Sequence, residues 1–148
     1  GDIDVFATND TDLLIDVNGY FAIPPQGGQA GFSLYSVYPC RVLDTRPPSG
    51  NGPFRGKLTV DVLNSACAPS SQAQSYVFNA TVVPPGPVGY LTLWPDGSSQ
   101  PTVSTLNAYD GEVTSNMAIV PAGNQGKIDV FASDLTNLLL DITAYFAP

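Results

Sequence analysis

The chain has 148 residues, of which 43 % are hydrophobic and only 12 % charged, and its net charge is −8. This length and hydrophobic content suffice for one domain with a sizeable core, and they exclude a chain that stays disordered throughout. The negative charge disfavours nucleic acid and anionic membrane surfaces as partners, because both are bound through clustered lysine and arginine. The low charge content is more typical of a secreted or surface protein than of a cytosolic enzyme.

The sequence of the first segment of the chain is repeated near the end of the chain. Residues 1–22 read GDIDVFATNDTDLLIDVNGYFA and residues 126–147 read GKIDVFASDLTNLLLDITAYFA, with 13 of 22 positions identical and no gap. In both copies apolar and polar residues alternate on either side of a polar stretch, which in the second copy spans residues 133–136. This pattern predicts two strands joined by a turn, that is, a β-hairpin. The apolar face expected for the first hairpin consists of Ile3, Val5, Leu13, Ile15, Val17 and Phe21.

The 125-residue offset between the copies is the size of a domain, not the shorter period of a solenoid. We therefore interpret residues 1–22 as a hairpin equivalent to the end of a preceding repeat, residues 23–31 as a Pro/Gly linker, and residues 32–148 as one complete repeat. An isolated hairpin is only marginally stable in water, so the apolar face of the first hairpin has to be buried against other residues. These residues belong to a neighbouring subunit, to an upstream domain, or to a pseudo-symmetric body that holds both hairpins.

Between the copies, short apolar stretches alternate with sequences rich in Pro, Gly, Asn and Asp, such as residues 47–52 and 84–87. These residues favour turns, and no stretch of ten residues carries a helical stripe. The pattern predicts an all-β fold, a β-sandwich of the jelly-roll or immunoglobulin-like type. The strands expected before the closing hairpin are 32–38, 57–62, 76–83, 88–94, 102–107 and 117–120.

The two cysteines, Cys40 and Cys67, favour one disulfide in a chain of this composition, with two buried free thiols as the alternative. Zinc is not expected, because the chain has no histidine and no Cys-x-x-Cys pair. The turn at residues 9–12 is rich in oxygen ligands, as calcium loops are, but half of its carboxylates are missing from the second copy. We therefore expect a solvated turn, and neither a metal nor a cofactor.

Three charged residues, Arg41, Asp44 and Arg46, lie within six positions. We interpret them as structural ion pairs, with an anion or carbohydrate site as the alternative. In the closing hairpin, Asp129 and Asp141 are expected on one face and close to each other across the strands, where like charges destabilise a sheet. A bidentate guanidinium would relieve this repulsion. The predicted partner of Asp141 is Arg41 or Arg46.

No enzymatic function is expected. The chain has no histidine to activate a serine or cysteine, and no Gly-rich phosphate loop between a strand and a helix. Tyr90 and Trp94 are candidates for contact with a glycan through their ring faces, with packing in the core as the alternative for Trp94. Asn9 and Asn79 each open an Asn-x-Thr sequon.

Four strings stand in a distinctive order: PCRVLDTR at 39–46, GYLTLWP at 89–95, STLN at 104–107 and DVNGYF at 16–21. Together they resemble a family of bacterial secreted tandem-repeat domains of large extracellular or surface proteins. The resemblance covers residues 32–148. It implies an all-β fold, tandem arrangement, an extracellular or cell-surface location and a Cys40–Cys67 pairing, and it implies no catalytic or ligand residues.

The function expected from these features is that of a structural repeat module, which forms a fibre or surface stalk by head-to-tail association with copies of itself or with neighbouring repeats. A carbohydrate-binding module with polysaccharide as its partner is the alternative. No apolar run is long enough to span a membrane. No signal peptide is recognised in the sequence, so a secretion signal is expected outside this chain.

Overall fold

The computed structural model describes residues 2–10, 13, 15, 17, 19–23 and 31–148. Within these residues the regular elements are strands and one short 3₁₀ turn, so the prediction of an all-β fold is confirmed. No helix in this part of the chain is long and apolar enough to cross a membrane. The elements are β1 (Ser33–Asp44), β2 (Phe54–Asp61), β3 (Ser75–Val83), β4 (Val88–Pro95), β5 (Leu106–Ala108), β6 (Thr114–Pro121), η1 (Asn124–Gly126) and β7 (Lys127–Ala147).

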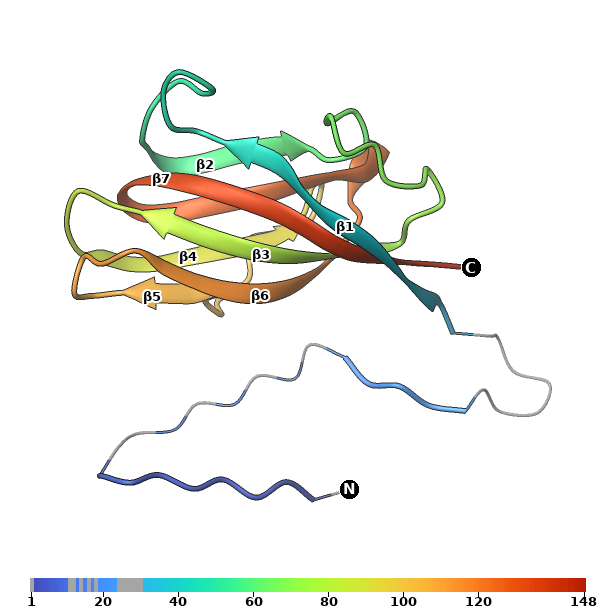
Figure 1. Cartoon of the computed structure of the whole chain (residues 1–148), viewed down its shortest axis with the longest axis horizontal. Coiled ribbons are helices and arrows are strands. Elements are labelled where there is room, and N and C mark those ends of the chain that lie inside the picture. The colour runs from blue at the N-terminus through green and yellow to red at the C-terminus, as the bar shows by residue number, and fades with distance from the viewer. Residues whose placement is uncertain (1, 11–12, 14, 16, 18, 24–30) are drawn as a thin grey trace.

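The strand β7 is the centre of the fold (Figure 1). It is 21 residues long and pairs with other strands on both sides. Its first half lies between β2 and β4, and its second half lies between β1 and β3, always antiparallel. One strand therefore holds four others in place, and the order across the sheet is β5-β4-β7-β3-β6, with β1 and β2 also on β7.

The hairpin predicted for residues 126–147 is wrong, because this segment is one continuous strand. The polar stretch at residues 133–136, predicted to be a turn, lies where β7 passes from one pair of neighbouring strands to the other. There Ser133 Oγ accepts the backbone N–H of Tyr90 at 2.9 Å, and Asp134 Oδ2 accepts that of Gly89, also at 2.9 Å. These side chains replace ladder hydrogen bonds at the start of β4, which lets β7 continue without a reversal.

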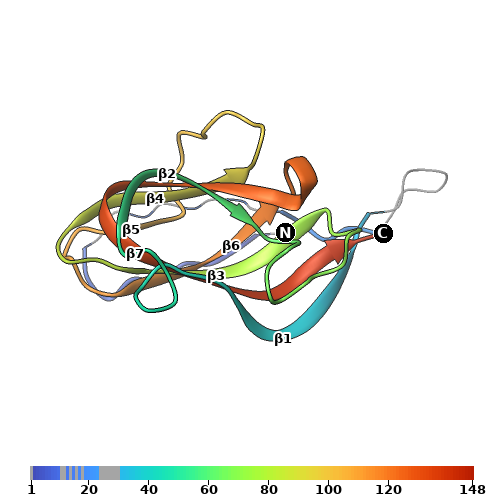
Figure 2. The same cartoon turned by 90° about the horizontal axis from the view of Figure 1, so that it is seen from above.

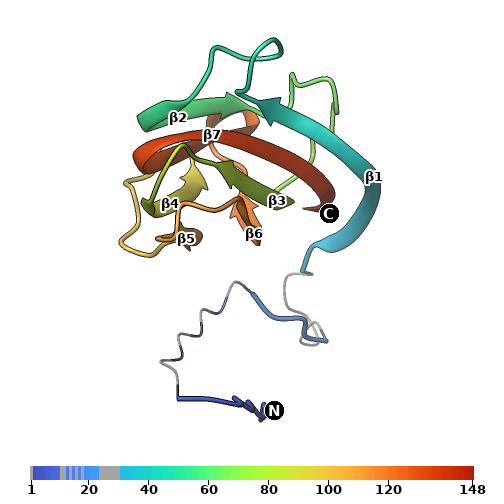
Figure 3. The ribbon, with the colours of Figure 1, turned by 60° about the vertical axis from the view of Figure 1, so that its left-hand side comes forward.

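The sheet curls until it is nearly closed, so its shape is closer to a barrel than to two clearly separate layers (Figures 2 and 3). Near the closure, Asn116 of β6 donates its side-chain N–H to the carbonyl of Thr105, just before β5, at 2.8 Å. The sandwich predicted from the short strands is thus not clearly formed. The physical reason is β7, whose two halves belong to opposite sides of the body and join them into one sheet.

The strand boundaries differ from the prediction mainly at four places. β2 begins at Phe54, three residues before the expected start at Lys57. β1 continues to Asp44, because the residues after Tyr38 pair with β7. The strand expected at 102–107 is reduced to Leu106–Ala108, and β6 is longer at both ends than the expected 117–120.

The interior of the barrel is apolar and includes one buried phenol. Tyr76 is fully buried and donates its hydroxyl to the carbonyl of Gly126 at 3.0 Å. Burial raises the pKa of Tyr76 to about 12. Gly126 has a φ of +72°, and a Cβ at this position would meet the side chains of Leu63 and Tyr76. The glycine that opens the second copy is thus required by its backbone and by its neighbours. The other large side chains that are fully buried are Phe78, Leu91, Ile128, Leu138, Leu140 and Ile142.

Candidate functional site

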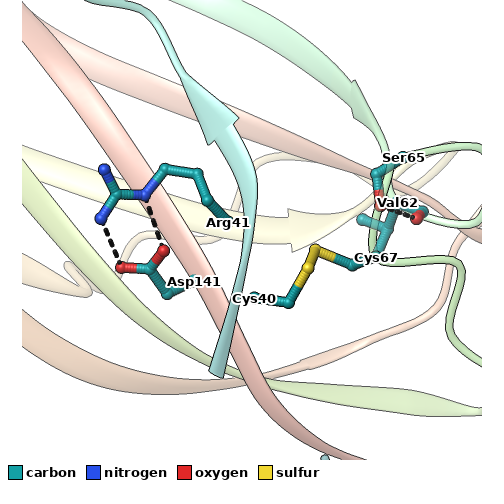
Figure 4. Close-up of a disulfide and its surroundings, with 6 residues drawn as sticks. All are labelled: Cys40, Arg41, Val62, Ser65, Cys67 and Asp141. Carbon is teal, nitrogen blue, oxygen red and sulfur yellow. Dashed lines mark hydrogen bonds and ion pairs between the residues drawn. A yellow bond between two sulfur atoms is a disulfide. The ribbon is translucent and has the colours of Figure 1, made fainter. Parts of the chain in front are cut away.

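The disulfide between Cys40 and Cys67 is formed, as predicted (Figure 4). It joins β1 to the loop that follows β2, with 5.7 Å between the two Cα atoms. A turn brings Cys67 to β1: Ser65 donates both its Oγ–H, at 2.7 Å, and its backbone N–H, at 3.2 Å, to the carbonyl of Val62. The bridge therefore holds the outer strand β1 against a part of the chain other than β7.

Next to the disulfide, Arg41 binds Asp141 with both arms of its guanidinium (Figure 4). Nε lies 2.7 Å from Oδ1 and Nη2 lies 3.0 Å from Oδ2, so the ion pair fastens β1 to β7. Of the two partners expected for Asp141, Arg41 and Arg46, it is Arg41 that binds it. Asp44 lies between two guanidiniums, 3.2 Å from Nη1 of Arg41 and 2.8 Å from Nη2 of Arg46. Hydrogen bonds from Arg46, aided by those from Arg41, hold the pKa of the Asp44 carboxyl well below its usual range.

Asp129 does not share this cluster, which corrects the expectation that it lies beside Asp141. Both acids are on β7, 12 positions apart, and they do not face each other across a hairpin. Asp129 is fully buried and accepts the hydroxyl of Thr59 at 2.7 Å, while Lys57 Nζ lies 2.8 Å from its other oxygen. Sequence reasoning missed Lys57 and Thr59. Their spacing of two places them on one face of β2, but only the pairing of β2 with β7 places that face over Asp129.

The two aspartates that recur in the repeat thus each bind a neighbouring strand to β7. Asp141 holds β1 to β7, and Asp129 holds β2 to β7. In the first copy, Asp4 stands where the second has Asp129, and the counterpart of Asp141 lies outside the described residues. The first copy therefore repeats apolar core positions and also the side chain that binds β2.

The described residues of the first copy are not part of the barrel. They form no strand, and they run apart from most of the body (Figure 1). The side chains that correspond to the core of β7 are exposed here: Ile3 is 73 % exposed, whereas its counterpart Ile128 is fully buried. The rest of the expected apolar face is also exposed, namely Val5, Leu13, Ile15, Val17 and Phe21.

The end of this segment touches the body at one place, which we call the joining end: the end of the barrel where Ser33 opens β1 beside Ala147 of β7. The ring centroids of Phe21 and Phe146 are 6.1 Å apart. A groove of about 310 Å³ lies at this end, lined by Gly19, Tyr20, Phe21, Ala22, Gly31, Phe32, Ser75, Ile119 and Phe146.

The aromatic candidates for a glycan site do not act together. Trp94 is only 5 % exposed and donates its indole N–H to the carbonyl of Ser98 at 3.1 Å, so its ring is part of the packed body. Tyr90 is half-buried, and one face of its ring stacks on Phe131, with 5.6 Å between the centroids. It lines an open groove of about 580 Å³ together with Gln100, Pro101, Thr102, Ser104 and Asn107.

The two sequons are in different surroundings. Asn9 is exposed, but the threonine of its sequon and half of the oxygen-rich turn at 9–12 lie outside the described residues. Asn79 is half-buried on β3, and its side-chain N–H lies 3.3 Å from the hydroxyl of Thr81 in the same sequon. Among the described residues, no group of three acidic, cysteine or histidine side chains is placed to hold a metal ion.

Comparison with known proteins gives no match: no family model, no curated protein and no solved structure is similar to this chain.

Replacing Arg41 with Gln is expected to lower the free energy of unfolding by about 1 kcal/mol, because a bidentate but partly exposed ion pair is lost. Urea denaturation monitored by the fluorescence of Trp94 measures this change. Arg55→Gln is the matched control, since Arg55 is also an exposed arginine, on β2. Equal stability of the two variants would show that Arg41 contributes nothing to holding β1.

Asp44→Asn is expected to reduce stability in a pH-dependent manner. Because the pKa of Asp44 is lowered by folding, its ionised form stabilises the protein above the unfolded pKa of about 4, and this contribution is lost as the pH falls toward the folded pKa. The difference in free energy of unfolding between wild type and variant should thus be largest above about pH 5 and shrink below about pH 4. Asp10→Asn, an exposed acid outside the barrel, serves as control. A difference that stays constant from pH 7 to pH 2 would contradict the assignment.

Proposed function

We propose that this chain is a structural module of an extracellular fibre or surface stalk made of successive units of about 125 residues. Residues 1–22 are the last strand of a preceding unit, residues 23–31 are the linker, and residues 32–148 are one complete unit. The partners of the module are copies of itself or neighbouring repeats. It carries no catalytic residues and needs no cofactor.

One observation carries this proposal: residues 1–22 repeat the central strand β7. A strand that has partners on both sides in each of its halves cannot be added to a barrel that already has one. The first copy keeps the apolar residues that β7 buries, yet these residues are exposed in this chain. The simplest barrel in which they are covered is one with its own β1 to β6 and without a second β7, that is, a preceding unit.

An extracellular location is favoured by the disulfide, because such bridges persist in oxidising compartments. The low charge content and the resemblance to secreted bacterial repeat domains point the same way. Ion pairs fasten β7 to β1 and to β2, and the disulfide fixes β1 to the loop after β2. These links suit a module that has to keep its shape outside the cell.

Light scattering on the whole chain and on residues 32–148 tests the proposal. The whole chain is expected to associate as its concentration rises, because it exposes a row of apolar side chains, whereas residues 32–148 are expected to stay monomeric with the same melting temperature. The whole chain with Leu13→Asp and Val17→Asp is the matched control and should also stay monomeric. If the whole chain is a compact monomer at every concentration, the first copy is not a connecting element.

A carbohydrate-binding module is the second candidate, and it rests on the groove beside Tyr90. The groove offers one aromatic face together with polar side chains such as Gln100 and Asn107, a combination that suits a sugar ring. Calorimetric titration with a panel of soluble polysaccharides tests it. Tyr90→Ala should weaken any binding at least tenfold, and Tyr38→Ala on the exposed side of β1 should not. The absence of binding across the panel would remove this candidate.

A further inference from the structure

The chain enters and leaves the barrel at the same end. β1 and β7 are antiparallel neighbours, and their register places Ser33, the first residue of β1, opposite Ala147, the last residue of β7. If residues 1–22 are the last strand of a preceding unit, then Ala22 marks the joining end of that unit as Ala147 marks it here. Only ten residues separate Ala22 from Ser33. The joining ends of successive units are therefore the parts of the units that the linker connects.

Phe21 and Phe146 show how the two ends meet. They occupy the same position of the two copies, 125 residues apart, and their rings are in contact with 6.1 Å between the centroids. Tyr20, Phe21 and Ala22 line the groove of about 310 Å³ at the joining end, where the barrel contributes Phe32, Ile119 and Phe146. The end of the preceding unit's last strand thus forms one wall of this groove, and the barrel forms the other.

A contact between equivalent residues of successive units propagates along an array. If Phe21 packs on Phe146, then Phe146 in turn packs on the corresponding phenylalanine of the next unit. Resting on the function proposed above, we infer that successive units meet at their joining ends through a continuous row of equivalent phenylalanines. The joining ends and linkers then form the spine of the assembly, and the barrels project from it.

This arrangement differs from the head-to-tail stacking expected from the sequence. In head-to-tail stacking, the linker has to run along a whole barrel to reach the joining end of the next unit. The nine residues of β3 give a barrel about 30 Å long, and the ten residues between Ala22 and Ser33 span at most about 36 Å when fully extended. Head-to-tail stacking therefore requires a nearly straight linker and separates Phe21 from Phe146, whereas joining-end contact requires neither.

Distances between spin labels in a two-unit chain test the inference. In this chain residues 32–147 are followed by residues 23–31 and then by residues 32–148 again, so that the first unit has its own β7. One variant carries Gln72→Cys in both units, at the joining end, and the other carries Glu112→Cys in both units, at the opposite end of the barrel. Both positions are exposed. The two labels at Gln72 are expected to lie closer together than one barrel length.

Two equal distances, each about a barrel length or more, would overturn the inference, because translation of one unit along the stack gives the same separation for every pair of equivalent sites. Phe146→Ser in the first unit should broaden the Gln72 distance distribution, whereas Tyr38→Ser, at a position 97 % exposed on β1, should leave it unchanged. An unchanged distribution with Phe146→Ser would contradict the row of phenylalanines.

Failure of the inference and failure of the proposed function are distinguishable when the two-unit chain and the whole chain are measured side by side. If the whole chain of residues 1–148 associates but the Gln72 labels of the two-unit chain are far apart, only the joining-end arrangement is wrong. If the whole chain stays monomeric at every concentration, the function proposed above fails as well.

Discussion

A chain of residues 32–126, which lacks both β7 and the first copy, is expected to be unfolded, and a separate peptide of residues 1–22 is expected to restore its fold. Without β7, four strands lose a pairing partner and the core loses Ile128, Val130, Leu138 and Leu140. Losing one such leucine to alanine already costs about 2–5 kcal/mol, which is comparable to the whole stability of a small domain. The truncated chain should therefore show no cooperative unfolding transition.

The fluorescence of Trp94 is a direct probe of this restoration, because Trp94 pairs with Asp129 of β7 and is buried in the complete barrel. A peptide of residues 126–148 is the positive control. A peptide of residues 1–22 with Leu13→Asp and Val17→Asp is the negative control, since both positions correspond to fully or almost fully buried residues of β7. If residues 126–148 restore the fold and residues 1–22 do not, the first copy is not an equivalent strand, and the tandem arrangement proposed here loses its basis.

Removing the disulfide by Cys40→Ser with Cys67→Ser is expected to lower the free energy of unfolding by about 3–4 kcal/mol. The bridge spans 27 residues, and the chain-entropy model gives this magnitude for a loop of that length. The native structure adds a reason: β1 pairs with β7 along one edge, and its other edge has no strand partner in the part of the chain that the structure describes. Without the bridge, β1 is held by one ladder and the Arg41 ion pair.

Urea denaturation of the oxidised protein, the reduced protein and the double serine variant measures this effect. The reduced protein and the variant should unfold at the same, lower urea concentration, because serine and a reduced thiol are similar in size. Equal midpoints for the oxidised and reduced protein would show that the bridge does not restrict the unfolded chain, and that β7 alone fixes β1.

The sequence determined several properties of this protein by itself. Alternation of apolar and polar residues, with Pro and Gly between the apolar stretches, is a local signal, and it correctly predicted an all-β chain. Two cysteines in such a chain allow one pairing, which is formed. The repeat of residues 1–22 at 126–147 is likewise visible in the letters alone, and it indicates that one structural element occurs twice.

What only the tertiary structure decided is which residues meet. A polar stretch such as residues 133–136 looks the same in a hairpin turn and in a strand whose side chains bind the neighbouring backbone, and the difference lies in Gly89 and Tyr90, more than 40 positions away. The burial of Trp94 and the pairing of Asp129 with Lys57 depend in the same way on β7 lying between β2 and β4. Period 2 defines the two faces of a strand but not its neighbours, because strand pairing is made by backbone groups that every residue type except proline carries alike.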